Sequence, residues 1–260
     1  MAKWQAQLFS LQLLSRGEAR RRAEHASRRD WQFERPVDAI PRARVWPKSR
    51  RSCAERSTIK HELRLKRCFD IVVALLLLML LAPGLLIIAL AIKSTSPAPV
   101  LFRQRRYGTC NRTFEILKFR TMFVDGADPS GVTQTRQGDP RVTPLGRLLR
   151  QSSLDELPQL WNVVKGDMSL VGPRPHVPGM LAGGVLYEEL VPNYFDRHCM
   201  RTGITGLAQV NGLRGSTEDP LVAKARIDQD LTYIRHWSLA LDLRILWETF
   251  RREFLTGQGY

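Results

Sequence analysis

The chain is 260 residues long, which suits one domain with extensions, and 43% of its residues are hydrophobic. Forty Lys and Arg residues against 25 Asp and Glu residues give a formal net charge of +15. The sequence contains no G-x-G-x-x-G, G-x-x-x-x-G-K-S/T, H-E-x-x-H or C-x-x-C motif. These features argue against a dinucleotide-binding fold, a P-loop and the common zinc sites.

Residues 1–62 form a basic extension ahead of the rest of the chain. Residues 1–66 hold 17 of the 40 basic residues and 7 of the 25 acidic residues, and so carry about two thirds of the net charge. Apart from Leu8–Leu14, no apolar period is sustained, which is typical of disorder. Arginines in such a segment could contact anionic lipid, at about 1 kcal/mol each near a charged surface. Nucleic-acid binding and a merely solvated tail are the alternatives.

An uncharged apolar run of 22 residues follows, from Ile71 to Ile92. A straight helix of that length spans roughly 33 Å, about one hydrocarbon core of a bilayer. Basic residues flank the run on both sides, so the positive-inside rule selects neither orientation. Proline removes a backbone hydrogen bond and kinks a helix, and Pro83 lies near the middle of the run. We therefore expect a re-entrant membrane helix hairpin over residues 63–98, broken at Pro83; a single span and a buried soluble helix are the alternatives.

Two partly alternating segments, Val100–Gln104 and Thr113–Phe119, predict a β-hairpin. The second segment leads to Lys118 and Arg120, which share one face of the strand. These two side chains are candidates for contacting an anionic substrate, and an ordinary polar strand face is the alternative. Residues 124–140 are rich in Asp, Gly, Ser, Thr and Gln and predict a polar loop.

Two adjacent carboxylates, Asp155 and Glu156, lie between a short basic helix ending at Arg150 and an apolar run. We expect Ser152 or Ser153 to cap a helix whose first turn holds both carboxylates, because the helix dipole favours negative charge there. Neighbouring side chains on a helix point about 100° apart, so one carboxylate can face a substrate while the other faces a metal ion or a second group. An acidic first turn without chemistry is the alternative.

Arg174 lies between Pro173 and Pro175, which fix the backbone on both sides of it. A guanidinium held in this way suits two-point binding of a phosphate, and a tight turn with a solvated arginine is the alternative. Residues 176–200 predict a helix interrupted by a glycine pair. The Gly-rich stretch 201–212 offers backbone N–H groups to an anion, although such stretches are usually turns.

Residues 223–255 predict helices in two pieces that meet near Ser238. An aromatic and aliphatic stripe runs along them: Tyr233, Trp237, Leu241, Ile245, Phe250 and Phe254. Such a stripe suits a helix at a membrane surface, and packing in a core is the equal alternative. The expected fold class is mainly α with a small β-hairpin, an α+β arrangement.

These motifs together resemble the bacterial sugar transferase family, the monotopic polyprenyl-phosphate phosphoglycosyl transferases. Members of this family start exopolysaccharide or O-antigen repeat units. The resemblance runs from about residue 63 to the C-terminus, and the chain looks most like the exopolysaccharide-initiating galactose- or glucose-1-phosphate transferases. Its motifs, in order, are Lys66-Arg-Cys-Phe-Asp70, the Pro-broken apolar run, Lys118-Phe-Arg-Thr-Met122, Leu149-Arg150 followed by Ser153-Leu-Asp-Glu-Leu-Pro-Gln-Leu-Trp-Asn162, Lys165-Gly-Asp-Met-Ser-Leu-Val-Gly-Pro-Arg-Pro175 and Gly203-Ile-Thr-Gly-Leu-Ala-Gln-Val-Asn-Gly212. One departure is Ala82-Pro83, where many members have Ser-Pro.

The resemblance implies an enzyme that transfers hexose-1-phosphate from a UDP-sugar to undecaprenyl phosphate and releases UMP. The hexose is galactose or glucose. Asp155 is then the nucleophile that forms a covalent phosphosugar intermediate, with Mg²⁺ at its carboxylate. Glu156 assists with proton or metal handling, and Arg150 binds a phosphate. The implied substrate contacts are Pro173, Arg174, Pro175, Lys118 and Arg120.

The resemblance also implies that residues 99–260 form a cytoplasmic catalytic domain with amphipathic C-terminal helices, held at the inner membrane of a bacterial cell. The expected partners are a UDP-hexose, undecaprenyl phosphate and inner-membrane lipid, without nucleic acid. A homodimer stays open, because the sequence does not address the oligomeric state. The alternative function is a membrane-tethered basic module that binds anionic lipid or nucleic acid without catalysis.

Overall fold

The computed structural model describes residues 60–95, 98–123, 138–215 and 217–255, which all belong to one unit, residues 43–260. The expected basic extension, residues 1–62, lies outside the described residues except at its end, where helix α2 (Lys60–Thr95) has already begun. Most of the expected polar loop at 124–140 also lies outside them. The described residues are mainly helical with small sheets, as the sequence predicted.

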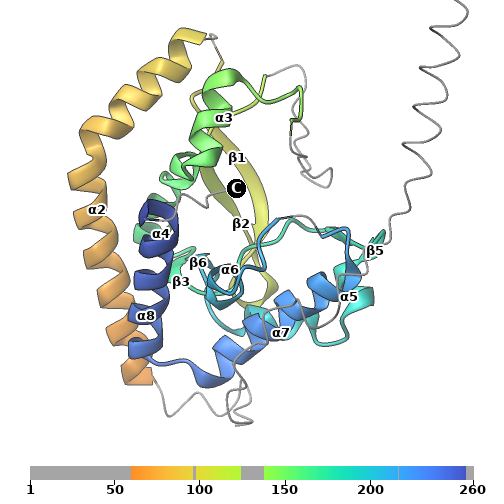
Figure 1. The fold of residues 1–260 in the computed structure, drawn as a ribbon. Coiled ribbons are helices and arrows are strands. Elements are labelled where there is room, and N and C mark those ends of the chain that lie inside the picture. The colour runs from red at the N-terminus through yellow and green to blue at the C-terminus, as the bar shows by residue number, and fades with distance from the viewer. Residues whose placement is uncertain (1–59, 96–97, 124–137, 216, 256–260) are drawn as a thin grey trace, which may run out of the picture. The chain divides into compact units, whose positions relative to one another are not determined.

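Helix α2 runs through the whole apolar segment without interruption. In the part of the chain that the structure describes, it is the one helix long and apolar enough to cross a membrane. The expected break at Pro83 is not present as a gap between two helices, because residues on both sides of the proline are helical. Figure 1 instead shows a single ribbon whose axis changes direction along its length. A proline can bend a helix without ending it, and the re-entrant path stays a prediction.

The predicted hairpin is confirmed and consists of β1 (Leu101–Tyr107) and β2 (Thr113–Phe119). Leu101 lies opposite Phe119, and the two strands are joined by a tight turn that contains η3 (Thr109–Asn111). The side chain of Asn162 attaches the hairpin to the rest of the domain: its Oδ1 accepts from the N–H of Leu117 at 2.9 Å, and its Nδ2 donates to the carbonyl of Glu115 at 2.7 Å.

The centre of the domain consists of short elements that follow the hairpin: α3 (Pro144–Gln151), η5 (Leu154–Glu156), α4 (Gln159–Lys165), β3 (Ser169–Val171), β6 (Gly203–Thr205) and α6 (Leu207–Val210). Strands β3 and β6 pair in parallel, with Ser169 opposite Gly203. The backbones meet so closely that a Cβ on Gly203 would lie 2.1 Å from the nitrogen of Gly172. Glycine is therefore required where the Gly-rich stretch approaches the segment that carries Arg174.

Residues 176–200 do not form the expected interrupted helix. They form four short elements: β4 (Leu181–Ala182), β5 (Val185–Leu186), α5 (Tyr187–Leu190) and η6 (Tyr194–Cys199). Gly183 and Gly184, with φ of 60° and 83°, make the turn between the two strands. The left-handed conformation that this glycine pair adopts ends the helical pattern and starts a hairpin.

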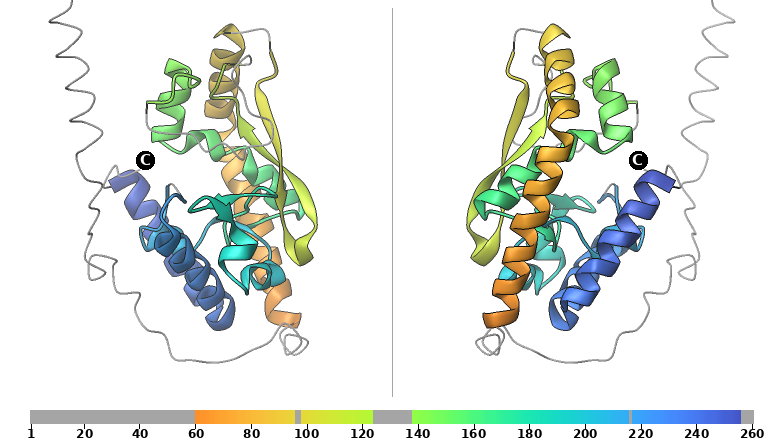
Figure 2. Two further views of the ribbon diagram at one scale, coloured as in Figure 1. Left: turned by 90° about the vertical axis from the view of Figure 1, so that its right-hand side faces the viewer. Right: turned by 90° about the vertical axis from the view of Figure 1, so that its left-hand side faces the viewer.

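The C-terminal helices are α7 (Pro220–His236) and α8 (Leu239–Phe250), followed by the π-helical turn η7 (Arg251–Leu255). Their junction lies where it was predicted, and the Ser238 hydroxyl accepts from the N–H of Leu241 at 3.2 Å to cap α8. The stripe is divided: Tyr233 and Ile245 are buried in the core, whereas Phe250 is 49% exposed. Figure 2 shows α8 on one side of the β3–β6 pair and the hairpin on the other.

A buried polar cluster attaches α2 to α7 and α8. Lys66 is buried and donates to Asp242 Oδ2 at 2.6 Å and to the carbonyl of Val171 at 3.1 Å. The fully buried Asp242 carboxylate also accepts from Tyr233 Oη at 2.7 Å and from Trp237 Nε1 at 3.1 Å. A buried carboxylate needs such partners, so this cluster fixes the start of the membrane-type helix to the domain.

Two further contacts connect α2 to the segments beside the candidate site. Asp70 accepts from Ser169 Oγ at 2.7 Å at the start of β3. Arg67 donates to the carbonyls of Val163 and Val164 at 2.6 and 2.9 Å. A guanidinium is favoured at these carbonyls, because the helix dipole leaves the C-terminal end of α4 partly negative.

Candidate active site

The two adjacent carboxylates lie in the 3₁₀ turn η5 and not in the first turn of a longer helix. Ser153 has a left-handed backbone with φ 54° and ψ 15°, and neither it nor Ser152 caps a helix in the expected way. The Ser153 hydroxyl donates to Glu253 Oε2 at 3.0 Å instead. Because α4 begins only at Gln159, the carboxylates lie on a separate turn ahead of it.

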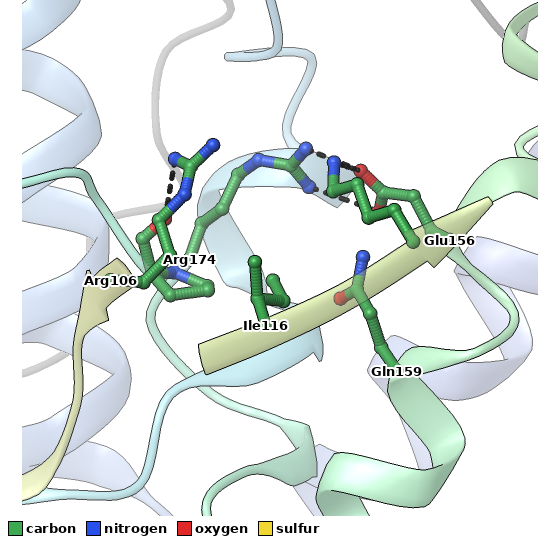
Figure 3. A pocket seen from close by; sticks show the side chains of 7 residues that line it. Arg106, Ile116, Glu156, Gln159 and Arg174 are labelled. Atoms are coloured by element: carbon green, nitrogen blue, oxygen red, sulfur yellow. Dashed lines mark hydrogen bonds and ion pairs between the residues drawn. The ribbon is translucent and has the colours of Figure 1, made fainter. Parts of the chain in front are cut away.

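Glu156 lies between two cations that come from distant parts of the chain. Its Oε1 accepts from Lys118 Nζ and from Arg174 Nη2, both at 2.7 Å. Figure 3 shows Arg174 and Glu156 pointing toward each other. The three residues come from β2 (Lys118), from η5 (Glu156) and from the loop after β3 (Arg174). Burial acts to raise the pKa of Glu156, but the charges of Arg174 and Lys118 outweigh it and hold the pKa well below its usual range. Glu156 is therefore ionised at neutral pH.

The pKa of Asp155 is shifted in the opposite direction from that of Glu156. The Asp155 side chain is buried, with 8% exposed, and it makes no hydrogen bond or ion pair with the residues that the structure describes. Burial raises the pKa of Asp155, against the charges of Lys118, Arg150 and Arg174, while the neighbouring Glu156 raises it further. An unshared carboxylate that is surrounded by cations is suited to attack an anionic electrophile, because the cations offset repulsion between the two.

Glu156, Lys118 and Arg174 line a small pocket, and further residues complete its walls: Arg106, Ile116, Gln159 and Pro175. The sequence analysis missed Arg106. Its Nη1 donates to the carbonyl of Pro175 at 3.3 Å and its Nη2 to the side chain of Gln104. Burial and the nearby Arg174 lower the pKa of Arg106 to about 10. Strand alternation could have indicated it, because Gln104 and Arg106 share a face of β1.

Two polar groups at this pocket are buried without a hydrogen-bond partner in the described part of the chain. They are Nε of Arg106 and Nε2 of Gln159. Burying an N–H group without an acceptor costs free energy, so such groups suit a site that a polar ligand enters. The pocket combines three cations with one carboxylate and is suited to an anion.

Four of the expected site residues are not among those that line this pocket: Asp155, which precedes Glu156 in the chain, and Arg150, Pro173 and Arg120. Arg150 Nε donates to Thr121 Oγ1 at 2.9 Å, although its charge still acts on Asp155. Arg120 Nη2 donates to the carbonyl of Ile92 at 3.3 Å, near the end of α2. Strand β2 ends at Phe119, so Arg120 lies beyond the strand and the alternation of faces does not extend to it. Arg120 contacts α2 and does not share a site with Lys118.

The two carboxylates are also the candidate ligands for a metal ion. No group of three or more His, Cys, Asp and Glu side chains gathers in the described ranges. Mg²⁺ is commonly held by one or two carboxylates together with substrate phosphates and water. Asp155 offers an unshared carboxylate, whereas Glu156 is engaged by Lys118 and Arg174. The residues fit an Mg²⁺ ion held by Asp155 and by phosphates of a bound substrate.

The chain belongs to the bacterial sugar transferase family, whose model matches residues 61–256. Among similar proteins, an exopolysaccharide production protein of Rhizobium leguminosarum bv. phaseoli is 53% identical over 199 residues, 76% of this chain and 100% of the relative. An undecaprenyl-phosphate glucose phosphotransferase of Komagataeibacter xylinus is 50% identical over 75% of this chain and 37% of the relative. A UDP-glucose:undecaprenyl-phosphate glucose-1-phosphate transferase of Escherichia coli (strain K12) is 47% identical over 75% of this chain and 41% of the relative. The chain thus matches less than half of the length of the last two relatives.

Proposed function

We propose that this protein transfers hexose-1-phosphate from a UDP-sugar to undecaprenyl phosphate through a covalent intermediate on Asp155, as the first step of exopolysaccharide synthesis. The observation that carries the proposal is the unshared, buried Asp155 carboxylate beside a pocket of three cations. Membership of the sugar transferase family and the names of the relatives support it. Those names favour glucose over galactose as the sugar.

The reaction consists of two displacements at the same phosphorus. A carboxylate oxygen of Asp155 attacks the sugar-bearing phosphorus of the UDP-sugar, a new P–O bond forms, and the bond to the leaving UMP breaks. An oxygen of the lipid phosphate then attacks the same phosphorus and releases the Asp155 carboxylate. The product is a polyprenyl diphosphate sugar, and dividing one difficult transfer into two steps is the advantage of covalent catalysis.

The charged residues of the pocket have different roles in binding the donor. Lys118 and Arg174 contact the diphosphate of the donor, and Glu156 holds both cations in place. The depressed pKa of Glu156 makes it a poor general base, so a positioning role is favoured over proton transfer. A bound Mg²⁺ would neutralise negative charge on the transferring phosphoryl group. Asp155 is the residue that would hold it.

We further propose that α2 holds the domain at the inner membrane of a bacterial cell, with the site facing the cytoplasm. Helix α2 has the length and hydropathy for this role. Its exposed apolar side chains include Met79, Leu80 and Ile87, each at least 67% exposed. Such a surface is suited to lipid. A site fixed beside α2 can receive a lipid phosphate from the membrane and a water-soluble UDP-sugar from the cytoplasm.

The proposal is tested by replacing Asp155 with asparagine, which keeps the size of the side chain and removes its nucleophilic charge. Release of UMP from UDP-glucose, in the presence of Mg²⁺ and undecaprenyl phosphate, should fall by at least about 10³-fold, as for loss of a nucleophile. Asp228→Asn, on the exposed face of α7, is the matched control and should keep full activity.

Trapping separates the covalent route from a direct one. Incubation of the protein with UDP-glucose alone should yield a phosphohexose adduct on the peptide that contains Asp155, detected by mass spectrometry. Normal turnover by Asp155→Asn, or release of UDP in place of UMP, would show that the assignment is wrong. Testing a panel of UDP-sugars and identifying the lipid product by mass spectrometry would show which sugar is transferred.

A further inference from the structure

Three consecutive carbonyl groups, at residues 173–175, are held by donors from outside their own segment. They accept hydrogen bonds from Gly203 N, Arg197 Nη2 and Arg106 Nη1, at 2.9, 2.6 and 3.3 Å respectively. Two of the three residues in the segment are prolines and have no N–H group. The segment therefore cannot fix itself by local hydrogen bonding, and its conformation depends on these external donors.

Among these donors Arg197 has the most enclosed environment. It is fully buried, with no exposed surface, in η6. Its Nε and Nη2 donate to Oδ2 of the buried Asp230 on α7 at 3.0 and 2.5 Å, and its guanidinium lies 5.5 Å from the centre of the Tyr194 ring. The Nη2 atom that contacts Asp230 is the same atom that donates to the carbonyl of Arg174. Asp230 thus fixes Arg197, and Arg197 contacts the backbone of Arg174.

A buried ion pair of this kind contributes little to stability, because the cost of taking two charges out of water offsets their attraction. The Nη1 of Arg197 is also buried without a partner among the described residues, which adds to that cost. A planar guanidinium can nevertheless donate in several fixed directions at once, whereas a lysine is a single point charge on a flexible stem. The geometry of Arg197 therefore suits orientation of the Arg174 segment better than it suits stabilisation of the core.

We propose that Arg197, fixed by Asp230, is a positioning residue that orients Arg174 toward Glu156 and the donor phosphates. The chain of contacts is continuous, from Asp230 to Arg197, from Arg197 to the carbonyl of Arg174, and from Arg174 Nη2 to Glu156 at 2.7 Å. This inference rests on the proposed function, because it assigns Arg174 to the UDP-sugar and not to the lipid phosphate.

The test is Arg197→Lys, which keeps the positive charge and removes the planar guanidinium with its several fixed donors. The Michaelis constant for UDP-glucose should rise about tenfold, as expected for loss of one hydrogen bond made by a charged group. The Michaelis constant for undecaprenyl phosphate should not change. In the Arg174→Gln background, Arg197→Lys should add no further loss, because a residue that acts through Arg174 has no effect once that guanidinium is gone. Independent, additive losses would overturn the proposal.

Arg226→Lys is the matched control, since Arg226 is a buried arginine on α7 that donates to the carbonyl of Leu213 at 2.9 Å. It should leave the Michaelis constant for UDP-glucose unchanged. If Arg197→Lys does not fold, Asp230→Asn tests the same link, because it keeps the shape and weakens the hold on Arg197. Failure of both variants to fold, or an equal rise for both substrates, would show that the pair is only structural.

The outcome can be separated from failure of the proposed function. If the proposed function is wrong, the unmodified chain releases no UMP. If only the positioning role is wrong, the unmodified chain is active and Arg197→Lys binds UDP-glucose with unchanged affinity. Calorimetric titration of UDP-glucose into the full chain measures this affinity without turnover.

Discussion

Asp155 and Glu156 are neighbours in the chain, yet the protein gives them opposite acid–base properties. Glu156 contacts Lys118 and Arg174 directly, and its pKa lies well below the usual range despite burial. Asp155 lacks such contacts with described residues, and burial raises its pKa. Carboxylates whose surroundings separate their pKa values in this way commonly have different roles. In the proposed mechanism one of them reacts and the other organises the cations.

The raised pKa of Asp155 leads to a prediction about pH dependence. The nucleophile must be ionised, so activity is lost as pH falls through the pKa of Asp155. Burial raises this pKa and the charge of Lys118 opposes the rise. Replacing Lys118 with methionine removes the opposing charge, so the acid limb of the profile of kcat/KM for UDP-glucose against pH should move to higher pH.

Lys165→Met is the control for this pH experiment, because Lys165 is exposed at the far end of α4 and pairs with Asp167. Its acid limb should coincide with that of the unmodified protein. A lower kcat/KM for Lys118→Met with an unmoved acid limb would mean that Lys118 binds substrate without influencing Asp155.

At the scale of elements, the polar cluster that attaches α2 to α7 and α8 is centred on one fully buried carboxylate, that of Asp242. Replacing Asp242 with asparagine leaves Lys66 buried without its closest counter-charge, 2.6 Å away. Breaking a buried pair from one side costs about 3–5 kcal/mol. The free energy of unfolding by denaturant, measured in detergent micelles, should fall by that amount.

The pair of Glu248 and Arg251 on α8 and η7 provides the comparison, because its side chains are partly exposed to solvent, at 30% and 50%. Glu248→Gln should change the free energy of unfolding by less than about 1 kcal/mol. Equal losses for Asp242→Asn and Glu248→Gln would mean that the buried cluster does not hold α2.

Elements with a strong periodic signal could be predicted from the sequence. The hairpin was predicted because its strands alternate, and the boundary between α7 and α8 because Ser238 interrupts an apolar period. The turn at Ser153 could not be predicted, since its left-handed backbone accompanies a contact with Glu253, 100 residues away. Residues 176–200 were predicted as helix because local composition does not reveal pairing of two-residue strands.

The candidate site was predicted in part for the same reason. Pairing of Glu156 with Lys118 and Arg174 agrees with the residue types that the sequence singled out. Arg120 was placed with Lys118 because alternation was assumed to continue past the end of β2. Arg197 carried no signal, because its partners are set by tertiary packing between η6 and α7. Buried charges are recognised only when the fold brings their partners together.

At the scale of the whole molecule, α2 has two surfaces. One side packs on the core through Phe69, Val73 and Ala74, while Leu76 and Leu80 on the other side are 56% and 75% exposed. Exposed apolar side chains at this density are suited to lipid and unsuited to water. The same helix therefore belongs to the domain and offers a surface to a membrane.

The path of α2 through a membrane can be tested with single cysteines at its two ends. Glu62 and Thr95 are both exposed and bound the membrane-type segment. In a cysteine-free background, Glu62→Cys and Thr95→Cys should both react with an impermeant thiol reagent from the cytoplasmic side if the helix is re-entrant. Labelling of the two positions from opposite sides would establish a single span.

The contact of Arg67 with the last carbonyls of α4 has a mechanical consequence. Helix α4 starts three residues after Glu156, so the anchor and the reacting turn are joined by one short, stiff lever. If α2 is embedded in a bilayer as proposed, a tilt of α2 would change the height of Asp155 above the lipid surface. Bilayer thickness would then affect how well the phosphate of a membrane-bound isoprenoid lines up with the Asp155 carboxylate.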